Sequence, residues 1–484
     1  MLAVLFNKRI WRSACFFISQ CLGFNFFAQD TVQLKNVEIS VSRYDFAAQG
    51  KKIQTIDSLS LAQFRFSNIS DVLSYNTPVH IKTYGPGGIS SSTFRGGSAE
   101  QTAVLWNGFN LQNTMLGQTD LSLLPAMLFD DVSLEYGGSS ALWGSGAVGG
   151  SIHLNNKTLF SKGFSARVNA GGGSFGTKNG SAVVVFSKDK LAVSTRLYAN
   201  DSENDFEFKN PGSDIIRKQR NASYNARGWV QELRLKTGKN SVLDLNAWLS
   251  NSQRELPSLN QNTTNKSDQR DAAARFNAQW HVYAKRLRSV TRAGAFFDRI
   301  RYSDSLAGIS SNNLTRSLMV ENENFYRWGS QHEALLGLSV LNTAAVSDSY
   351  SGRQGLNRIS LFLGNKFVLA GGRLVSTISL RAEYFSPSRL PVTGNWSAEY
   401  RISRGLTIGL NGAKVYRQPT LNELYWLPGG NPQLSPEQGY TAEGFVAFKR
   451  SLGRHVVSLT GAMFKRGINN WILWVPGEKG NTSP

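Results

Sequence analysis

The chain has 484 residues with 46 glycines, only 13 prolines and 41% hydrophobic residues, a composition that excludes disordered and collagen-like chains. Its formal net charge of +20 raises the question of a nucleic-acid partner. Because no basic cluster is interleaved with aromatic residues, we interpret this charge as spread over strands and loops and expect no nucleic-acid partner. Beyond the N-terminus no apolar run approaches the ~18 residues of a spanning helix, so any membrane insertion must use strands.

The first 28 residues have the pattern of a secretory signal peptide. Lys8, Arg9 and Arg12 precede an apolar stretch that ends before Ala28. We therefore expect export and cleavage after Ala28. Both cysteines of the chain lie inside this segment, so the exported protein would have no thiol for catalysis, disulfides or metal binding.

Residues 44–156 have the pattern of a compact mixed domain, preceded by a lead-in at 29–43. Short apolar runs predict strands, and one amphipathic run predicts a helix with Asn68 as its N-cap. The expected strands are Val79–Thr83, Ala103–Trp106 and Val132–Tyr136, and the expected helix is Ile69–Leu73.

Beyond Gly163 apolar and polar residues alternate almost to the end of the chain. The clearest run places Ala274, Phe276, Ala278, Trp280 and Val282 on one face and Arg275, Asn277, Gln279 and His281 on the other. A soluble β-sandwich and a transmembrane barrel both give this alternation, so the period leaves open whether the apolar face meets lipid or a core. An uninterrupted series of strands after a secretory signal favours an outer-membrane barrel over 157–484.

Several motifs carry a resemblance to a known family. The segment 135–154 resembles the plug signature of the TonB-dependent receptors, and Phe94-Arg95-Gly96-Gly97 and Asn107-Gly108 are similar to earlier plug motifs of that family. The segments 416–426 and 430–437 are similar to a motif of its barrel.

The resemblance implies an all-β transmembrane barrel of about 22 antiparallel strands with a small N-terminal α+β plug domain in its lumen. At ~20 residues per strand and connection, the residues after Gly163 supply roughly 16 strands. We therefore expect that the last strands are missing from this sequence.

A segment directly after the expected signal matches the TonB box of the family. Its residues are Val37, Glu38, Ile39, Ser40, Val41 and Ser42. The resemblance implies that the inner-membrane TonB protein adds a strand to this segment and pulls the plug. The alternative is that the segment is simply the first strand of the plug.

Two turn-rich segments resemble the outward-facing apical loops that contact cargo in cobalamin receptors. They contain Tyr84, Gly85, Pro86, Gly87 and Gly88, and Gln112, Asn113, Thr114, Met115 and Leu116. The resemblance implies that these residues bind substrate. Ordinary exposed turns are the alternative.

An acidic cluster, Asp201, Glu203 and Asp205, lies where the cobalamin receptors carry a calcium-binding loop. Carboxylate oxygens suit calcium, which is the one cofactor that we expect. A solvated acidic loop is the alternative.

Two glycine patterns raise an enzyme hypothesis that their context rejects. The G-x-G-x-x-G pattern at 144–149 lacks a surrounding βαβ unit and an acidic residue about 20 positions on. The G-x-S-x-G pattern at 172–176 lies between two expected strands, whereas a nucleophile elbow needs a strand-to-helix turn. We therefore expect no enzyme.

The sequence thus predicts a receptor in the outer membrane that imports a large, scarce nutrient by TonB-dependent active transport. The expected partners are TonB, outer-membrane lipid and the cargo. Cobalamin is the first candidate, because of the apical loops, the acidic loop and a segment at 470–476 that looks like a strand of the cobalamin receptors. A ferric siderophore is the alternative cargo, and a non-transporting barrel, an adhesin or an enzyme, is the alternative of another class.

Overall fold

The N-terminal part of the described chain folds into a domain of short helices and strands, the plug. A computed structural model describes residues 42–160, 163–209, 214–258, 266–386, 390–476 and 482–483. The helices of the plug are α2 (Arg43–Phe46), α3 (Ser58–Gln63), α4 (Ile69–Asn76), α5 (Ser140–Trp143) and the 3-10 turns η2 (Ala99–Gln101), η3 (Leu121–Leu123) and η4 (Ala126–Leu128). Its strands are β1 (Ile53–Ile56), β2 (His80–Thr83), β3 (Ser90–Thr93), β4 (Thr102–Trp106), β5 (Phe109–Asn110), β6 (Asp131–Tyr136) and β7 (Gly150–Asn155).

The plug sheet has the strand order β1-β6-β7-β4-β5, in which β4 and β7 are parallel. Each strand expected for this region is present, and α4 is confirmed with Asn68 at its N-cap. The backbone N–H of Asn68 donates to the Asp71 carboxylate, which stabilises the first turn. Strand β2 starts one residue later than expected, because the N–H of Val79 donates to the Thr77 hydroxyl instead of a neighbouring strand.

The C-terminal part forms a single large antiparallel sheet. Its strands are β8 (Gly163–Gly172), β9 (Lys178–Lys188), β10 (Leu191–Ser202), β13 (Tyr224–Gly238), β14 (Ser241–Leu256), β15 (Ser267–Tyr283), β16 (Leu287–Asp304), β17 (Ile309–Trp328), β18 (His332–Ser347), β19 (Gln354–Leu369), β20 (Leu374–Ser386), β21 (Thr393–Arg401), β22 (Leu406–Arg417), β23 (Glu437–Leu452) and β24 (His455–Asn469). Connections hold β11 (Glu207–Lys209), β12 (Ile216–Lys218), η5 (Ala370–Gly372) and α6 (Leu421–Tyr425), and β25 (Val475–Pro476) pairs with β26 (Thr482–Ser483).

These 15 sheet strands pair in chain order, each with the next, which agrees with the roughly 16 expected. Strands β8 and β24 are the edges of the described sheet. None of the helices in the described residues is long and apolar enough to cross a membrane.

The two ends of the sheet differ in the length of their connections. One end has tight turns, such as 189–190, 239–240 and 453–454, and the other has longer loops, such as 348–353 and 418–436. In outer-membrane barrels the short turns face the periplasm and the long loops face the cell exterior. We therefore assign the loop-bearing end to the outside of the cell.

The two faces of the sheet decide between lipid and an apolar core. On β20, Ile378 and Leu380 are 44% and 50% exposed, whereas their neighbours Thr377 and Ser379 are 0% and 2% exposed. A soluble sandwich would bury the apolar residues and expose the polar ones. The reverse arrangement belongs to a membrane barrel, whose outward face is apolar and whose lumen is polar.

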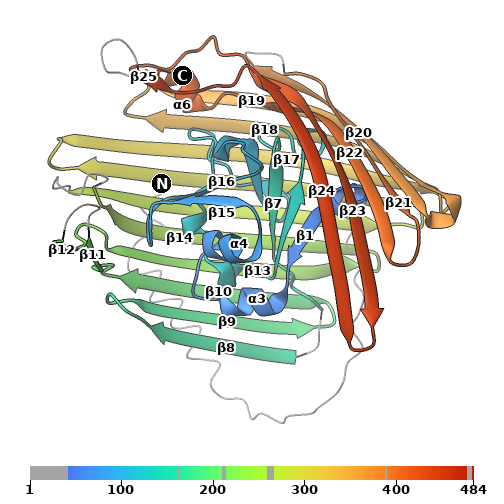
Figure 1. Cartoon of the computed structure of the whole chain (residues 1–484), viewed down its shortest axis with the longest axis horizontal. Helices are drawn as coiled ribbons and strands as arrows, with labels where there is room; N and C mark the ends of the chain where they lie inside the picture. Colours follow the sequence, from blue (N-terminus) through green and yellow to red (C-terminus); the bar gives the residue numbers. More distant parts are fainter. Residues whose placement is uncertain are drawn as a thin grey trace. The chain divides into compact units, whose positions relative to one another are not determined.

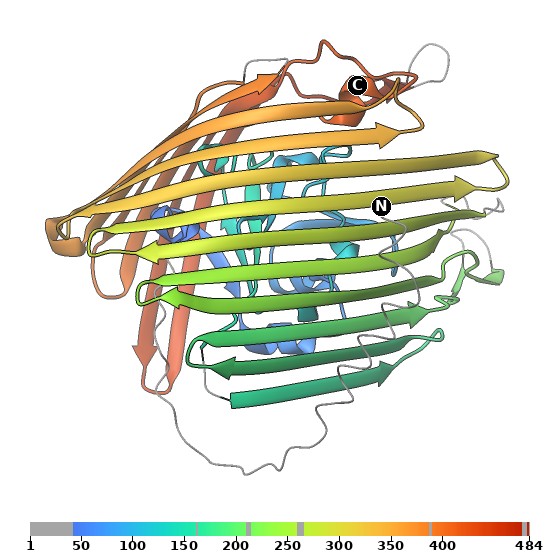
Figure 2. The same cartoon turned by 180° about the vertical axis from the view of Figure 1, so that it is seen from behind.

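The sheet curves around the plug, which contacts its inner face (Figures 1 and 2). Aromatic rings form the centre of this contact. Trp106 of β4 packs edge-to-face on Trp248 of β14, with ring centroids 5.2 Å apart, and Phe109 lies 5.8 Å from Phe296 of β16. The plug and the barrel wall thus share one hydrophobic core.

We predict a depth-dependent cost of charge on the outward face. Leu361 lies near the middle of β19. The variant Leu361→Arg should lower the unfolding free energy of the barrel by about 2–4 kcal/mol, because the guanidinium would enter the hydrocarbon. Leu369 lies on the same face at the turn end of β19. The variant Leu369→Arg should lower the unfolding free energy by at most about 1 kcal/mol. Urea titration in lipid vesicles measures both values, and equal small losses would contradict a lipid-facing sheet.

Candidate functional site

The inner wall of the barrel holds the plug through buried ion pairs. Arg43, the first residue of α2, reaches two carboxylates of β17: its Nη2 lies 2.5 Å from Glu321, and its Nε donates to Glu323. Arg292 of β16 contacts the same carboxylates at 2.9 and 2.5 Å. The two cations balance the two anions in a site closed to solvent, and we call these four residues the Arg43 cluster.

Further pairs attach the plug to other parts of the wall. Asp120 contacts Arg254 of β14 at 2.7 Å, and Asp130 contacts Arg196 of β10 at 2.5 Å. On the opposite part of the sheet, Arg95 pairs with Glu443 of β23. The plug is therefore held by charges from strands at both ends of the strand order, and each end of the wall depends on it for neutralisation.

Inside the plug, Glu135 of β6 is buried beside Lys51, whose Nζ lies 2.5 Å from it, and beside His153 at 3.6 Å. Burial alone would raise the pKa of Glu135. The neighbouring Lys51 and His153 more than offset burial and hold this pKa well below its ordinary range. Glu135 is thus charged at neutral pH and orders the start of the plug around Lys51.

The apical loop after β5 is held mainly by its own side chains. The amide of Gln112 donates to the carbonyls of Thr102 and Gly117, and the Asn113 side chain accepts from the N–H groups of Met115 and Leu116. Leu116 is 40% exposed, whereas Met115 is 2% exposed. Met115 packs in a hydrophobic cluster with Tyr350, Tyr416 and other residues of the wall.

The helix α6 of the barrel is docked on this apical loop. The N–H groups of Leu421 and Asn422 donate to the carbonyls of Thr114 and Met115, at 3.0 and 3.1 Å. Thr420 caps α6 in a capping box with Glu423. A bidentate pair between Arg417 and Glu423 fixes the base of the loop.

The other apical loop, 84–88, touches the wall near the outer end of β13. The Pro86 carbonyl accepts from the Asn204 side chain at 3.0 Å. Gly87 has a φ of +73° and lies so close to Tyr224 that a Cβ would be 2.4 Å from its ring. A glycine is therefore required at 87 by both conformation and space. Tyr84 is 50% exposed, and the Lys82 ammonium lies 5.2 Å from the centre of its ring.

A cavity of about 320 Å³, the outer cavity, lies between the apical loop after β5 and the loop-bearing ends of the strands, and none of residues 84–88 lines it. Plug residues on its wall include Ile89, Asn113, Met115 and Leu116, and barrel residues include Tyr302, Asn313, Asn422 and Trp426. Two of the three arginines on its wall are neutralised: Arg254 by Asp120 and Asp271, and Arg275 by Asp298 at 2.6 Å. The third, Arg299, lies on the outward side of β16 and donates to the neutral Asn312. Amide and aromatic groups thus dominate what it offers to a ligand.

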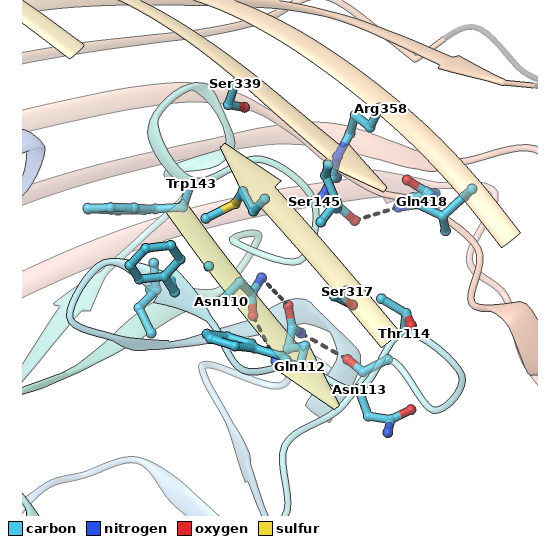
Figure 3. A pocket seen from close by; sticks show the side chains of 18 of the residues that line it. Asn110, Gln112, Asn113, Thr114, Trp143, Ser145, Ser317, Ser339, Arg358 and Gln418 are labelled. Carbon is cyan, nitrogen blue, oxygen red and sulfur yellow. Dashed lines mark hydrogen bonds between the residues drawn. The ribbon is translucent and has the colours of Figure 1, made fainter. Parts of the chain in front are cut away.

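A second cavity of about 140 Å³, the inner cavity, lies deeper between plug and wall (Figure 3). Figure 3 shows Asn110, Gln112, Asn113 and Thr114 of the plug near Ser317 of the wall. Asn113 lines both cavities, so the apical loop separates them. Arg43 and Glu321 of the Arg43 cluster also line the inner cavity.

Comparison with known families explains this arrangement. The model of the TonB-dependent receptor plug domain matches residues 47–151, and that of the TonB-dependent receptor-like β-barrel matches residues 145–484. The chain belongs to the TonB-dependent receptor family. Members of this family are transporters and receptors of the outer membrane and are not enzymes, as the sequence predicts.

Among curated proteins, this receptor is similar to the vitamin B12 transporter BtuB of Vibrio vulnificus, at 23% identity over 474 residues, with 94% of this chain and 73% of that protein covered. It is equally similar to BtuB of Photobacterium profundum, at 23% identity over 487 residues, with 96% and 75% covered.

Solved structures show the same fold. The copper transporter OprC matches with a TM-score of 0.73 at 12% identity, with 89% of this chain and 75% of that chain covered. The ferric enterobactin receptor PfeA of Pseudomonas aeruginosa matches with a TM-score of 0.72 at 13% identity, with 89% of this chain and 73% of that chain covered. The FrpB iron transporter of Neisseria meningitidis matches with a TM-score of 0.73 at 12% identity, with 90% of this chain and 75% of that chain covered. Likeness at these identities shows the fold and leaves the cargo open.

The predicted TonB box of the receptor falls mostly outside the described residues, which begin at Ser42. The Ser42 side chain accepts from the N–H of Asp45 and caps α2. The expected signal peptide also lies outside them. Arg43, which anchors the plug to β17, directly follows the predicted TonB box in the sequence.

The acidic loop of the receptor does not converge on one point. Asp201 lies near the end of β10. Asp205 pairs with Lys218 of β12, and this pairing lowers the pKa of the Asp205 carboxyl. The described part of the chain contains no group of three His, Cys, Asp or Glu side chains that could hold a metal. Calcium binding by Asp201, Glu203 and Asp205 stays a prediction of the sequence.

Both glycine patterns have structural roles in the receptor. Gly144 and Gly146, with φ of +77° and +86°, form the turn between α5 and β7. The pattern at 172–176 is the hairpin between β8 and β9, as expected.

The Arg43 cluster and the Arg254 pairs have no counterpart among the residues expected from the sequence. Arg43 and Glu323 are separated by 280 positions, and no local pattern joins them. The one available signal is the presence of Glu321 and Glu323 on the lumen-facing side of β17, where each buried carboxylate requires a cation.

We predict that Arg43→Met loosens the plug by about 3–5 kcal/mol, because Glu321 and Glu323 would share a single cation, Arg292. Hydrogen exchange of α2 and unfolding in lipid measure this. Adding Glu323→Gln to Arg43→Met should recover part of the loss. As a control, Arg65→Met removes a plug arginine that bonds only neutral groups and should cost about 1 kcal/mol. Equal effects at 43 and 65 would contradict the role of the cluster.

We predict an acid-sensitive plug. The pKa of Glu135 is lower in the folded plug than the ~4.3 of an unfolded chain. Its pairing therefore contributes fully above about pH 4.3 and is lost as the pH falls toward the folded pKa. The stability difference between the native chain and Glu135→Gln should be constant from about pH 7 to 5 and shrink below about pH 4. Thermal unfolding across pH measures it, and a difference that grows on acidification would refute it.

Proposed function

We propose that the receptor imports cobalamin across the outer membrane by TonB-driven active transport. The relatives named vitamin B12 transporters match 94% and 96% of this chain, and this extent includes both plug and barrel. The observation that carries the proposal is the chemistry of the outer cavity.

Arg254 and Arg275 on the wall of the outer cavity are paired with carboxylates, and Arg299, the third arginine there, lies on the outward side of β16, so the lumen side of the cavity offers few unpaired cations. Amides and aromatic rings also line the cavity, among them Asn313, Tyr302 and Trp426. A large ligand with many amides and an aromatic base, such as cobalamin, suits this surface. An anionic iron chelate would need unpaired cations to replace its hydration.

Energy coupling follows from the position of Arg43. The predicted TonB box, 37–42, ends directly before this residue, and Arg43 lines the inner cavity. TonB would add a strand to the box and pull it toward the periplasm. The pull acts first on the Arg43 cluster, and breaking it removes one side of the inner cavity. Cargo bound in the outer cavity would then pass the apical loop.

A ferric siderophore is the second candidate cargo. Besides Arg43, three arginines line the inner cavity and would attract an anion: Arg358, Arg381 and Arg417. Arg381 and Arg417 are each paired with a buried carboxylate, Glu383 and Glu437, which weakens this attraction. The structural neighbours that bind iron compounds share the fold with this chain, but their identities of 12–13% carry no information on cargo.

A binding titration with cobalamin and with ferric enterobactin distinguishes the two candidates. We expect saturable binding of cobalamin. The exposed Leu116 lines the outer cavity, so Leu116→Glu should weaken binding by about tenfold or more through an unpaired carboxylate under the ligand. Leu59→Glu, an exposed residue of α3 away from this cavity, is the matched control and should bind as the native chain does. Preference for ferric enterobactin would reverse the assignment.

Deletion of residues 37–42 tests energy coupling. The deletion leaves the outer cavity intact, so cargo binding should persist while uptake into cells falls to the background level. Unchanged uptake would contradict TonB coupling and favour a non-transporting barrel, such as an adhesin, because such a barrel needs neither the box nor the plug.

A further inference from the structure

The geometry points to a lipid-binding site on the outward face of the barrel, formed by Arg270, Arg299, Arg301 and Arg316 above an apolar groove, and we propose that it holds a diphosphorylated glycolipid of the outer leaflet. We call these four residues the outward arginine cluster.

All four arginines point away from the lumen. On β15, Arg270 shares a face with Phe276 and Trp280, which are 39% and 50% exposed. On β16, Phe296 faces the plug, so the odd-numbered Arg299 and Arg301 face outward.

Strand β17 adds the fourth cation. Arg316 shares the outward face with Leu318 and Val320, which are 38% and 56% exposed. The cluster thus occupies three adjacent strands near their loop-bearing ends, where the apolar band meets the headgroups of the external leaflet.

The cluster carries more positive charge than its surroundings neutralise. Arg270 and Arg301 lie directly opposite each other on β15 and β16, an arrangement of like charges that destabilises a sheet. Arg270 has one carboxylate near it, Asp268 at 3.6 Å, and Arg299 donates to the neutral Asn312. Within the described part of the chain, Arg301 and Arg316 have no ion-pair partner. Such a cluster lowers its energy when an anion binds it.

The spacing of the cluster favours two phosphates over one. Arg316 lies opposite Phe297, which precedes Arg301 by four residues, so the two guanidiniums start about 13 Å apart along the strands. The three strands together are about 10 Å across. Arginine binds phosphate through paired N–H donors, and a single phosphate would not contact the whole cluster.

An apolar groove continues from the cluster toward the membrane centre. This groove, of about 740 Å³, lies where small residues leave room on the outward face: Ala247, Ala278, Ala293 and Ala295. Phe276 and Leu318 border it, and Leu318 lies two residues from Arg316 on β17. A headgroup held by the arginines would therefore place its acyl chains in the groove, where they gain dispersion contacts.

The proposal is tested by measuring, with native mass spectrometry, which lipids the full chain retains when it is released from nanodiscs. Phosphatidylethanolamine is the bulk lipid of the nanodiscs and lipid A is the probe. We expect lipid A to be retained, and the triple variant Arg270→Gln, Arg299→Gln, Arg301→Gln to lose at least about tenfold in affinity. The matched control is Lys285→Gln with Arg286→Gln, in the turn at the other end of the same hairpin, and it should retain lipid A as the native chain does.

Two further measurements separate the headgroup from the groove. Dephosphorylated lipid A should bind the native chain as weakly as lipid A binds the triple variant. Ala293→Trp fills the groove from the lipid side without touching the lumen, and it should also reduce retention by about tenfold. If the triple variant does not fold, the single variant Arg301→Gln replaces it, and it should show a smaller loss of lipid A retention. Equal retention by native chain and variants, or equal retention of phosphatidylglycerol, would overturn the proposal.

Discussion

The structure depends on one constraint: the inward face of the barrel is polar and buried, so its charges must be paired, and several of them find partners in the plug. Residues such as Glu321, Glu323 and Arg254 lie at 0–5% exposure and would be costly without counter-charges. The plug supplies Arg43 to the first two and Asp120 to the third. Seating of the plug therefore completes the pairing of these wall charges, and the plug cannot leave without creating unpaired charges. That cost explains why energy from outside the membrane is needed.

The distribution of these pairs along the chain bears on how such energy is applied. They involve plug residues from Arg43 through Arg95 to Asp130, each bonded to a different strand. A pull that enters at the N-terminal end meets Arg43 before the others. We expect the pairs to break in succession rather than together, so that each step needs a fraction of the whole cost, and an early stop would leave most of the plug in place.

Much of the fold could be predicted from the sequence, because its signals are local. The alternation around Phe276 and Trp280 gave the strands, and the spacing of apolar residues with Asn68 gave α4. The period did not reveal which face meets lipid, since that depends on what the sheet encloses. The structure shows which face meets lipid, because the apolar Ile378 is exposed and its polar neighbour Thr377 is buried.

The candidate site was less accessible from the sequence. The apical loops were located by resemblance, but Met115 is buried against the wall while Leu116 is exposed, a difference set by residues 230 or more positions away in the chain, such as Tyr350. The Arg43 cluster depends on partners equally distant. Pairing between the lumen and the plug is a property of the assembled fold: Glu321 and Glu323 on the lumen-facing side of β17 signal that a cation is needed, but no sequence pattern identifies Arg43 as that cation.

The docking of α6 has a consequence for how such receptors diversify. The tie between the apical loop and the outer rim consists of main-chain groups, the carbonyls of Thr114 and Met115 and the N–H groups of Leu421 and Asn422. Main-chain bonds survive almost any exchange of side chains. Exposed positions such as 116 can therefore change in the course of evolution, while the main-chain attachment of the apical loop to α6 is inherited unchanged.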